Sequence, residues 1–311
     1  MHDAESPLPG GAHGDPLRRV AVVIVSYRSA EHLARLLPEL PRHRLAAVVV
    51  VDNDSGDGSV EVARSVDGVH VVAHGANVGF GAGCNLGEVA SPADADLVLF
   101  LNPDASIAAA DLERLVGHLD RHPSCALVGP RVFRGDEPLP SAGGEAGVRT
   151  ELRRFAPLFV ARRLPERRLP AAYDVTGPVT YVEGACMLVR RAVFREVGRF
   201  DPAYFLFFEE LDLARRLRAA GWSVELVADA RAEHAVAASR ATAPDRARPA
   251  LVESTVRYLE RRHGRSRAAW FVLLARVCWW IRVRRGQLSP DERRSYLVAA
   301  RRATGAVSAS R

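Results

Sequence analysis

The chain has 311 residues, enough for one large domain or two smaller ones around a substantial apolar core. Hydrophobic residues make up 48% and charged residues 26%, a composition that excludes a disordered or collagen-like protein. The net charge of +6 is unevenly spread, because 14 arginines and only three acidic residues occur from Arg257 onward. This basic end predicts an anionic partner, either a membrane surface or a nucleic acid.

The four cysteines are far apart and form no CxxC pair, which indicates neither a disulfide framework nor a zinc ribbon. The first 17 residues are rich in Pro, Gly and Asp, lack the regions of a signal peptide, and are predicted to be disordered. No stretch reaches the roughly 20 apolar residues needed to span a bilayer. Together these features predict a cytoplasmic protein.

Short β-branched runs alternate with helical patterns over the first half of the chain. Strands are predicted at 19–26, 45–51, 69–73, 95–101 and 125–130. Helices are predicted at 30–40, 55–65, 80–90 and 108–122. Such alternation predicts an α/β fold with a mostly parallel sheet, helices on both faces, and a ligand outside the carboxyl ends of the strands.

The pattern weakens after Pro130. From there the sequence predicts, in order, long loops at 131–178, a strand at 179–191, an aromatic loop at 198–210, a helix at 211–222 and a strand pair at 223–236. From about Pro249 the chain is predicted to be helical and arginine-rich to its end. In that stretch, helical spacing places six apolar side chains along one face: Trp270, Leu273, Leu274, Val277, Trp280 and Ile281.

Polar residues follow four of the predicted strands. They are Ser26 and Tyr27, then Asp52, Asn53 and Asp54, then Asn77, and finally Asn102 and Asp104. Any one of them could simply form a turn. Because the carboxyl ends of parallel strands share one edge, four such groups together predict a binding crevice. The glycines around Gly79 do not match GxGxxG and follow the third strand, so they are weak support for a dinucleotide site.

Three further features are candidates for chemistry. Asp104 is suited to hold Mg²⁺ or Mn²⁺ together with phosphate oxygens, or to cap the following helix. The acids Glu209, Glu210 and Asp212 lie beside three phenylalanines, where poor solvation would raise the pKa of a carboxyl group, but they also suit the start of a helix. His234 ends a strand-like run, where a lone histidine is more often structural.

With these residues in view, the chain resembles the inverting family 2 glycosyltransferases, and most of all their bacterial rhamnosyltransferase branch. The matching motifs occur in the family's order over roughly residues 18–240: VVIVSYRS, VVDNDSGDGS, GANVGFGAGCN, LFLNPDA, YVEGACMLVRR, GRFDPAYFLFFEELDLARRLRAAGW and ARAEH. The resemblance implies a GT-A fold, in which a nucleotide-binding α/β sheet flanked by helices is fused to an acceptor-binding half. It divides the chain into a lead (1–17), a catalytic domain (18–240) and a basic helical extension (241–311).

The resemblance also implies roles for matching positions. Ser26, Tyr27 and Asp52 would hold base and ribose, Asn77 and Gly79 would line the nucleotide pocket, Glu183 and Gly184 would form the acceptor floor, and Arg216 matches an arginine of the helix after the acidic pair. Asp104 would bind a Mg²⁺ or Mn²⁺ ion that His234 completes. The catalytic base would be Glu210, where this branch has an aspartate one methylene shorter, with Asp212 in reserve.

The implied reaction is inverting transfer of a sugar such as rhamnose from a nucleoside-diphosphate sugar to a glycan or lipid-linked acceptor, in cell-envelope polysaccharide synthesis. The basic tail would then bind an anionic membrane at its cytoplasmic face rather than a nucleic acid. Two other functions stay open on the residues alone. A nucleotidyltransferase would normally have a glycine-rich basic loop where this chain has SYRSAEH, and a nucleic-acid-binding protein would show a recognised motif.

Overall fold

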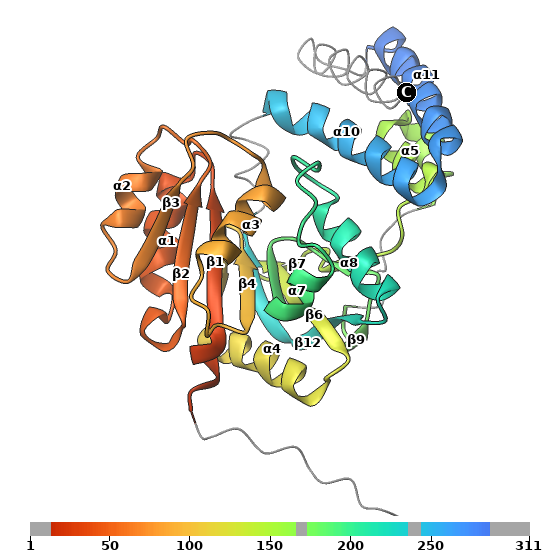
Figure 1. Ribbon diagram of the computed structural model, residues 1–311. Helices are drawn as coiled ribbons and strands as arrows, with labels where there is room; N and C mark the ends of the chain where they lie inside the picture. The colour runs from red at the N-terminus through yellow and green to blue at the C-terminus, as the bar shows by residue number, and fades with distance from the viewer. Residues whose placement is uncertain (1–13, 166–172, 236–243, 287–311) are drawn as a thin grey trace, which may run out of the picture.

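The computed structural model describes residues 14–165, 173–235 and 244–286 (Figure 1). Within these residues a mixed sheet has the strand order β3-β2-β1-β4-β11-β6-β12-β5, with β7 and β9 paired to its far half. Its strands are β1 (Val20–Ser26), β2 (Ala47–Asp52), β3 (Val69–Ala73), β4 (Leu97–Leu101), β5 (Ala105–Ile107), β6 (Cys125–Arg134), β7 (Glu137–Pro138), β9 (Gly177–Pro178), β11 (Cys186–Arg190) and β12 (Ser223–His234). A small second sheet pairs β8 (Ala142–Gly143) with β10 (Tyr181–Val182).

Helices cover both faces of the large sheet (Figure 1). The described helices are α1 (Ala30–Glu39), α2 (Ser59–Arg64), α3 (Phe80–Ala90), α4 (Ala109–Arg121), α5 (Val148–Phe155), α6 (Leu158–Ala161), α7 (Arg191–Glu196), α8 (Glu209–Ala219), α10 (Pro244–His263) and α11 (Arg265–Arg284), of which α5, α10 and α11 pack together beyond the sheet (Figure 1). Strands β1 to β4 are parallel, as the alternation predicts, whereas β11 runs antiparallel to β4 and β6. The predicted α/β architecture is therefore confirmed, with an antiparallel strand at its centre.

Strand β1 is apolar and fully buried because helices cover both sides of it. Alternate residues enter separate cores: Val22 and Ile24 pack with α1 and α4, while Val23 and Val25 pack with α3 and α8. Helix α3 lies very close to the sheet, since a Cβ atom on Gly87 would lie 2.3 Å from Val23 Cγ1. A Cβ atom on Gly83, nearer the amino end, would lie 2.8 Å from Val25 Cγ1, so small residues bring this part of the helix close to the carboxyl end of β1.

Four local predictions are wrong. The strand predicted at 179–191 is split into β10 and β11, and the strand pair predicted at 223–236 is the single strand β12, with an irregularity between Val227 and Arg231. Asp104 does not cap a helix, because β5 intervenes before α4. Helix α8 begins at Glu209 rather than at 211, which puts both paired glutamates in its first turn.

The predicted boundaries also shift. Residues 1–13 of the predicted lead lie outside the described residues, but Leu17 is completely buried and Asp15 caps the short 3₁₀ helix Pro16–Arg19. The predicted loops at 131–178 contain β7, β8, α5, α6 and β9. At the other end, Tyr258 of α10 is completely buried and packs with Phe208. The C-terminal helices therefore pack closely against the rest of the fold, beside α5 (Figure 1).

Candidate active site

Strands β1, β2 and β3 end in line at the carboxyl edge of the sheet. Ser26 is paired with Asp52, and Asp52 with Ala73. Ser26 and Asp52 are buried, and the buried Ser26 Oγ and Asn53 Oδ1 atoms have no hydrogen-bond partner within the described chain. Buried polar atoms are normally satisfied, so these two are available to a ligand at this edge.

The loops after β1 and β2 are fixed to each other. The Asp52 carboxylate accepts hydrogen bonds from the backbone N–H of Ser55 at 3.1 Å and from its hydroxyl, and Ser55 Oγ accepts one from the N–H of Arg28 at 3.0 Å. Arg28 has a positive φ of 54°, and its guanidinium lies 5.3 Å from the ring centre of the half-buried Tyr27. Residues from both loops that are predicted to contact the nucleotide therefore lie together at one end of the sheet.

Gly79 joins this edge to the segment that leads into α8. Its N–H donates to Asn77 Oδ1 at 3.1 Å, and its carbonyl accepts from Asn53 Nδ2 at 3.0 Å. It has a φ of +89°, and a Cβ atom here would lie 2.1 Å from the backbone oxygen of Phe205. Only glycine fits this position, which brings the first turn of α3 against the aromatic segment.

That aromatic segment ends in two consecutive residues with left-handed backbone, Phe207 (φ 69°) and Phe208 (φ 71°). Such conformations are strained for bulky residues and persist only where surrounding packing imposes them. Phe208 is buried, with its ring centre 5.4 Å from that of Tyr258. The turn delivers two carboxyl groups, Glu209 and Glu210, to the amino end of α8.

The two glutamates have different environments. Glu209 is only 5% exposed, and its buried Oε2 has no hydrogen-bond partner among the described residues. Burial, reinforced by the neighbouring Glu210, raises the pKa of Glu209 well above its usual range. Glu210 is half-buried. The buried Glu209 therefore favours its protonated form, whereas Glu210 is the more solvated carboxyl of the pair.

Asp212 is placed differently from the glutamate pair. It is completely buried, with its two oxygens 2.7 Å from Arg216 Nε and 3.2 Å from Arg215 Nη2. Arg216 also donates to the backbone oxygens of Val197 and Arg199. Asp212 and Arg216 therefore hold the segment before the aromatic turn, and this arrangement favours Glu210 over Asp212 as a proton acceptor.

Asp104 and His234, far apart in the sequence, are neighbours in the structure. Antiparallel pairing of β5 with β12 sets His234 opposite Ala105, and the N–H of Ala235 donates to the Asp104 carbonyl at 3.0 Å. His234 Nε2 lies 3.2 Å from Asp104 Oδ1, and the Asp104 side chain is only 2% exposed. Two ligand atoms about 2.1 Å from a cation and at right angles would be about 3 Å apart, so this oxygen–nitrogen pair fits one Mg²⁺ or Mn²⁺ ion.

The predicted acceptor floor adjoins this pair. The N–H of Asn102, just beyond β4, donates to the backbone oxygen of Ala185 at 2.9 Å. The N–H of Glu183 donates to the backbone oxygen of Ser141 at 3.0 Å. The hydroxyl of Tyr181 donates to Glu183 Oε1 at 3.2 Å. A Cβ atom on Gly184 would lie 4.0 Å from Phe80. Glu183 and Gly184 therefore lie between the Asp104 turn and the start of α3.

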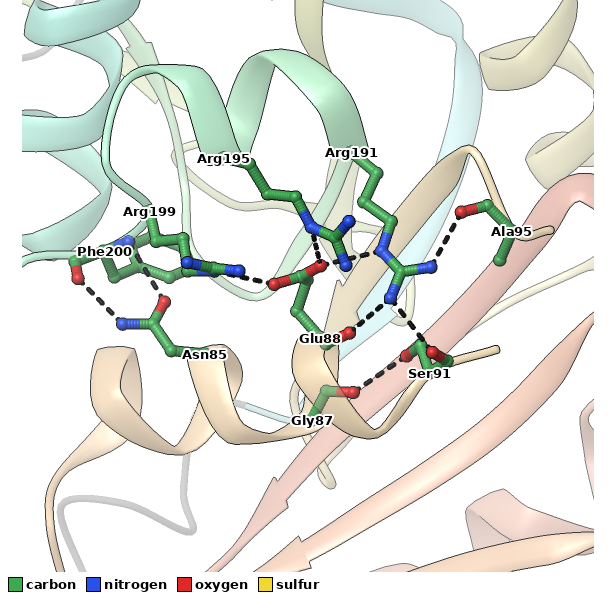
Figure 2. A network of polar contacts seen from close by, with 9 residues as sticks. All are labelled: Asn85, Gly87, Glu88, Ser91, Ala95, Arg191, Arg195, Arg199 and Phe200. Atoms are coloured by element: carbon green, nitrogen blue, oxygen red, sulfur yellow. Dashed lines mark hydrogen bonds and ion pairs between the residues drawn. The ribbon is translucent and has the colours of Figure 1, made fainter. Parts of the chain in front are cut away.

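A buried ionic cluster that no sequence pattern indicated surrounds Glu88 on α3 (Figure 2). Glu88 of α3 is completely buried, with its oxygens 2.7 to 2.8 Å from the guanidinium groups of Arg191, Arg195 and Arg199. Burial alone would raise the pKa of Glu88, but hydrogen bonds from the three arginines outweigh it and lower that pKa. Over a hundred residues separate the partners, so no local pattern marks them.

The same surface of α3 carries a second link. Asn85 Nδ2 donates to the backbone carbonyl of Phe200 at 2.8 Å, and Asn85 Oδ1 accepts from the backbone N–H of Phe200 at 3.1 Å (Figure 2). Together with Glu88, this bond fastens the aromatic segment to the helix that follows Gly79. The acidic turn is therefore positioned by the helix that packs on β1 and β2.

Another group of possible metal ligands lies elsewhere. His118, Cys125 and Glu225 are buried with ligand atoms within 4.8 Å of one another. Glu225 takes hydrogen bonds from His118 Nε2 at 2.8 Å and Ser223 Oγ at 2.6 Å, and burial raises the pKa of Cys125 to about 11. Cys125 and Glu225 lie at the amino ends of β6 and β12, and His118 reaches them from α4, so the group is at the opposite edge of the sheet from Asp104.

Solved structures share this architecture. The mannosyltransferase PcManGT from Pyrobaculum calidifontis, in complex with GDP-Man and Mn²⁺, superposes with a TM-score of 0.52 at 16% identity, covering 96% of this chain and 90% of that one. At this identity the likeness concerns the fold alone. Among the described helices, none is both long and apolar enough to cross a membrane.

The chain is also similar in sequence to proteins of known activity. It is 33% identical over 264 residues to N-acetylglucosaminyl-diphospho-decaprenol L-rhamnosyltransferase of Mycobacterium tuberculosis. The alignment covers 78% of this chain and 84% of that protein. It is 28% identical over 253 residues to rhamnosyltransferase WbbL of Escherichia coli, covering 78% and 93% of the two chains. A model of glycosyl transferase family 2 matches residues 21–198. The chain therefore belongs to glycosyl transferase family 2, as its ordered motifs indicate.

Proposed function

We propose that this glycosyltransferase moves L-rhamnose from a nucleoside-diphosphate donor to a hydroxyl of a lipid-linked glycan, with inversion at the anomeric carbon. Two relatives that align with 78% of the chain are rhamnosyltransferases, and one of them acts on a decaprenyl-diphosphate-linked sugar. The observation that carries the proposal is the Asp104–His234 pair at the carboxyl edge of the same sheet as the buried Ser26 and Asp52. Family membership favours sugar transfer over nucleotidyl transfer or nucleic-acid binding.

The donor would lie along this carboxyl edge. Ser26, Asp52 and Tyr27 would contact base and ribose, and the segment around Asn77 and Gly79 would close the pocket. Asp104 and His234 would hold Mg²⁺ or Mn²⁺, which would supply positive charge to the leaving diphosphate. The oxygen–nitrogen donor set and its 3.2 Å spacing support this role.

Glu210 would act as the catalytic base. It would accept the proton of the acceptor hydroxyl as that oxygen attacks the anomeric carbon from the face opposite the diphosphate. The new glycosidic bond forms as the bond to the diphosphate oxygen breaks, so one displacement inverts the configuration. The choice of Glu210 over Glu209 is supported by the burial of Glu209, which raises the pKa of that carboxyl, and by the greater exposure of Glu210. Glu183 and Gly184 would form the floor for the acceptor.

A lipid-linked acceptor would require the enzyme to work at a membrane surface. We place the enzyme on the cytoplasmic face of the cell membrane as a peripheral protein. The arginine-rich C-terminal helices support this placement, since their charge is opposite to that of anionic lipids.

The direct test is a transfer assay with the purified full chain, Mn²⁺, a nucleoside-diphosphate L-rhamnose and a synthetic N-acetylglucosaminyl-diphospho-polyprenol. The expected product is a disaccharide lipid, with an anomeric configuration at the new bond opposite to that of the donor. Parallel reactions with nucleoside-diphosphate glucose and mannose measure donor preference. Faster transfer from one of these sugars would contradict the rhamnose assignment, and retention of configuration would contradict the mechanism.

A further inference from the structure

Helix α11 carries an apolar face that the rest of the described protein leaves bare. Five of the eight exposed large apolar side chains in the described chain belong to this one helix. They are Trp270 (61% exposed), Leu273 (51%), Leu274 (37%), Val277 (48%) and Trp280 (54%). Their spacing places them along one side over three turns, since residues three, four and seven apart share a helix face.

The other side of α11 is already used for packing. Ala268, Phe271 and Cys278 are buried, and the Phe271 ring centre lies 5.6 Å from that of Phe155 in α5. The helix is thus fixed to the protein through one apolar face and presents a second one outward. Solvent-exposed apolar faces of this extent normally mark an interaction site.

The charges around this face have one sign. Between residues 251 and 286 the exposed charged residues are all arginine, whereas Glu253 and Glu260 are half-buried. Arg276 lies at the edge of the face, and the guanidinium of Arg284 stacks 4.8 Å from the ring centre of Trp280. An apolar strip with tryptophans near both ends and arginines beside it matches the boundary between lipid headgroups and acyl chains.

We propose that the α11 face, defined as Trp270, Leu273, Leu274, Val277 and Trp280, docks the enzyme on an anionic lipid surface. The apolar side chains enter the headgroup–acyl boundary while the arginines contact lipid phosphates. A second copy of the chain fits less well, because twofold pairing would set one arginine-rich edge against another. Lipid docking is argued from the exposed side chains of α11 themselves. It rests on the proposed function only for its biological role, which is to bring the active site to a membrane-bound acceptor.

The test is sedimentation of the full chain with vesicles of phosphatidylglycerol or of phosphatidylcholine at low salt. We expect binding to the first kind, little binding to the second, and release at high salt. Replacing three exposed apolar residues (Trp270→Ser, Val277→Ser, Trp280→Ser) should weaken binding about tenfold or more. Replacing Arg276→Gln with Arg284→Gln should also weaken it.

A matched control has Val89→Ser with Arg121→Gln, two exposed positions far from α11. It should bind vesicles like the wild type. Transfer to a soluble acceptor analogue should be unchanged in all these variants, so a failure of lipid binding is distinguishable from a failure of the proposed activity. The proposal is wrong if the wild type ignores anionic vesicles or if the triple variant still binds. It is equally wrong if the wild type is a dimer that the triple variant converts to monomers without any lipid binding.

Discussion

The hydroxyl of Ser254 in α10 donates a hydrogen bond of 2.9 Å to the backbone oxygen of Leu206. Leu206 directly precedes the two left-handed residues Phe207 and Phe208, and Tyr258, one turn further along α10, packs on the ring of Phe208. A helix beyond the segment matched by the family model therefore holds the strained turn that delivers Glu210.

Ser254→Ala should lower turnover while leaving the KM for the donor unchanged, because it loosens the turn but touches no donor residue. A hydrogen bond of this kind contributes about 1 kcal/mol, so we expect about a fivefold effect on kcat. The control is Ser65→Ala, which removes a similar serine-to-carbonyl bond at the end of α2. An equal loss of kcat in both variants would contradict a positioning role for Ser254.

Glu210→Gln should reduce kcat by about 10²–10⁴, since the amide cannot accept the acceptor proton. Donor affinity and the melting temperature should stay close to those of the wild type. Asp212→Asn should instead lower the melting temperature, because it breaks the buried pair with Arg216. Steady-state kinetics and thermal unfolding of both variants separate the two roles. If Asp212→Asn lost more activity at unchanged stability, Asp212 would be the base.

Glu209→Gln should be well tolerated, because the amide resembles the protonated carboxyl in size. The folded-state pKa of Glu209 is raised above its usual 4.5, so the native protein holds a proton that the unfolded chain releases. Its contribution to the unfolding free energy therefore declines as pH rises from about 4.5 toward the folded-state pKa. Urea unfolding at pH 5 and pH 7 should show that the free energy of unfolding of the variant, relative to that of the wild type, is higher at pH 7 than at pH 5. A gain confined to the lower pH would mean that the native carboxyl is ionised.

Asp104→Ala should abolish the dependence of nucleoside-diphosphate binding on Mn²⁺, because it removes the buried carboxylate of the proposed metal pair. His234→Ala should weaken Mn²⁺ binding by about 10- to 100-fold, the range seen when a metal site is perturbed. Titration calorimetry with the diphosphate, with and without Mn²⁺, measures both effects. Cys125→Ser at the other cluster is the control, and unchanged binding in Asp104→Ala would remove this residue from the site.

Glu88→Gln should destabilise the protein by about 3–5 kcal/mol, since it leaves three guanidinium groups without their buried counter-charge. The control Glu31→Gln removes an exposed pair with Arg35 and should cost less than about 1 kcal/mol. Because the pKa of Glu88 is lowered in the folded state, its contribution is present above the usual pKa of 4.5 and is lost as pH falls through the folded value. Urea unfolding of both variants at neutral and acidic pH measures these free energies. Equal losses of unfolding free energy in the two variants would contradict a stabilising role for the Glu88 cluster.

The sequence predicted best what local periodicity determines. The alternation of apolar runs with helical patterns indicated the order of strands and helices through β4, and the polar residues after the strands indicated the edge where Asp104 lies. It could not predict the ionic cluster of Glu88, because its partners are joined only by folding. The start of α8 was also missed, since the aromatic run favours a loop and Tyr258, which packs on that turn, lies some fifty residues away.

The burial of Tyr258 has a practical consequence for expressing parts of this enzyme. A catalytic fragment that ends near residue 240, where the recognisable motifs stop, would lack α10 and leave the surface around Phe208 exposed to water. It would also lose two hydrogen bonds. One joins the Tyr258 hydroxyl to Glu145 Oε2 at 2.9 Å, and the other joins His263 Nε2 to the backbone oxygen of Ala146 at 3.1 Å. Such a fragment would be prone to aggregation and would carry a loosened turn at Phe207 and Phe208. A useful recombinant boundary therefore falls after α11, and the proposed lipid binding is better tested by point substitutions than by truncation.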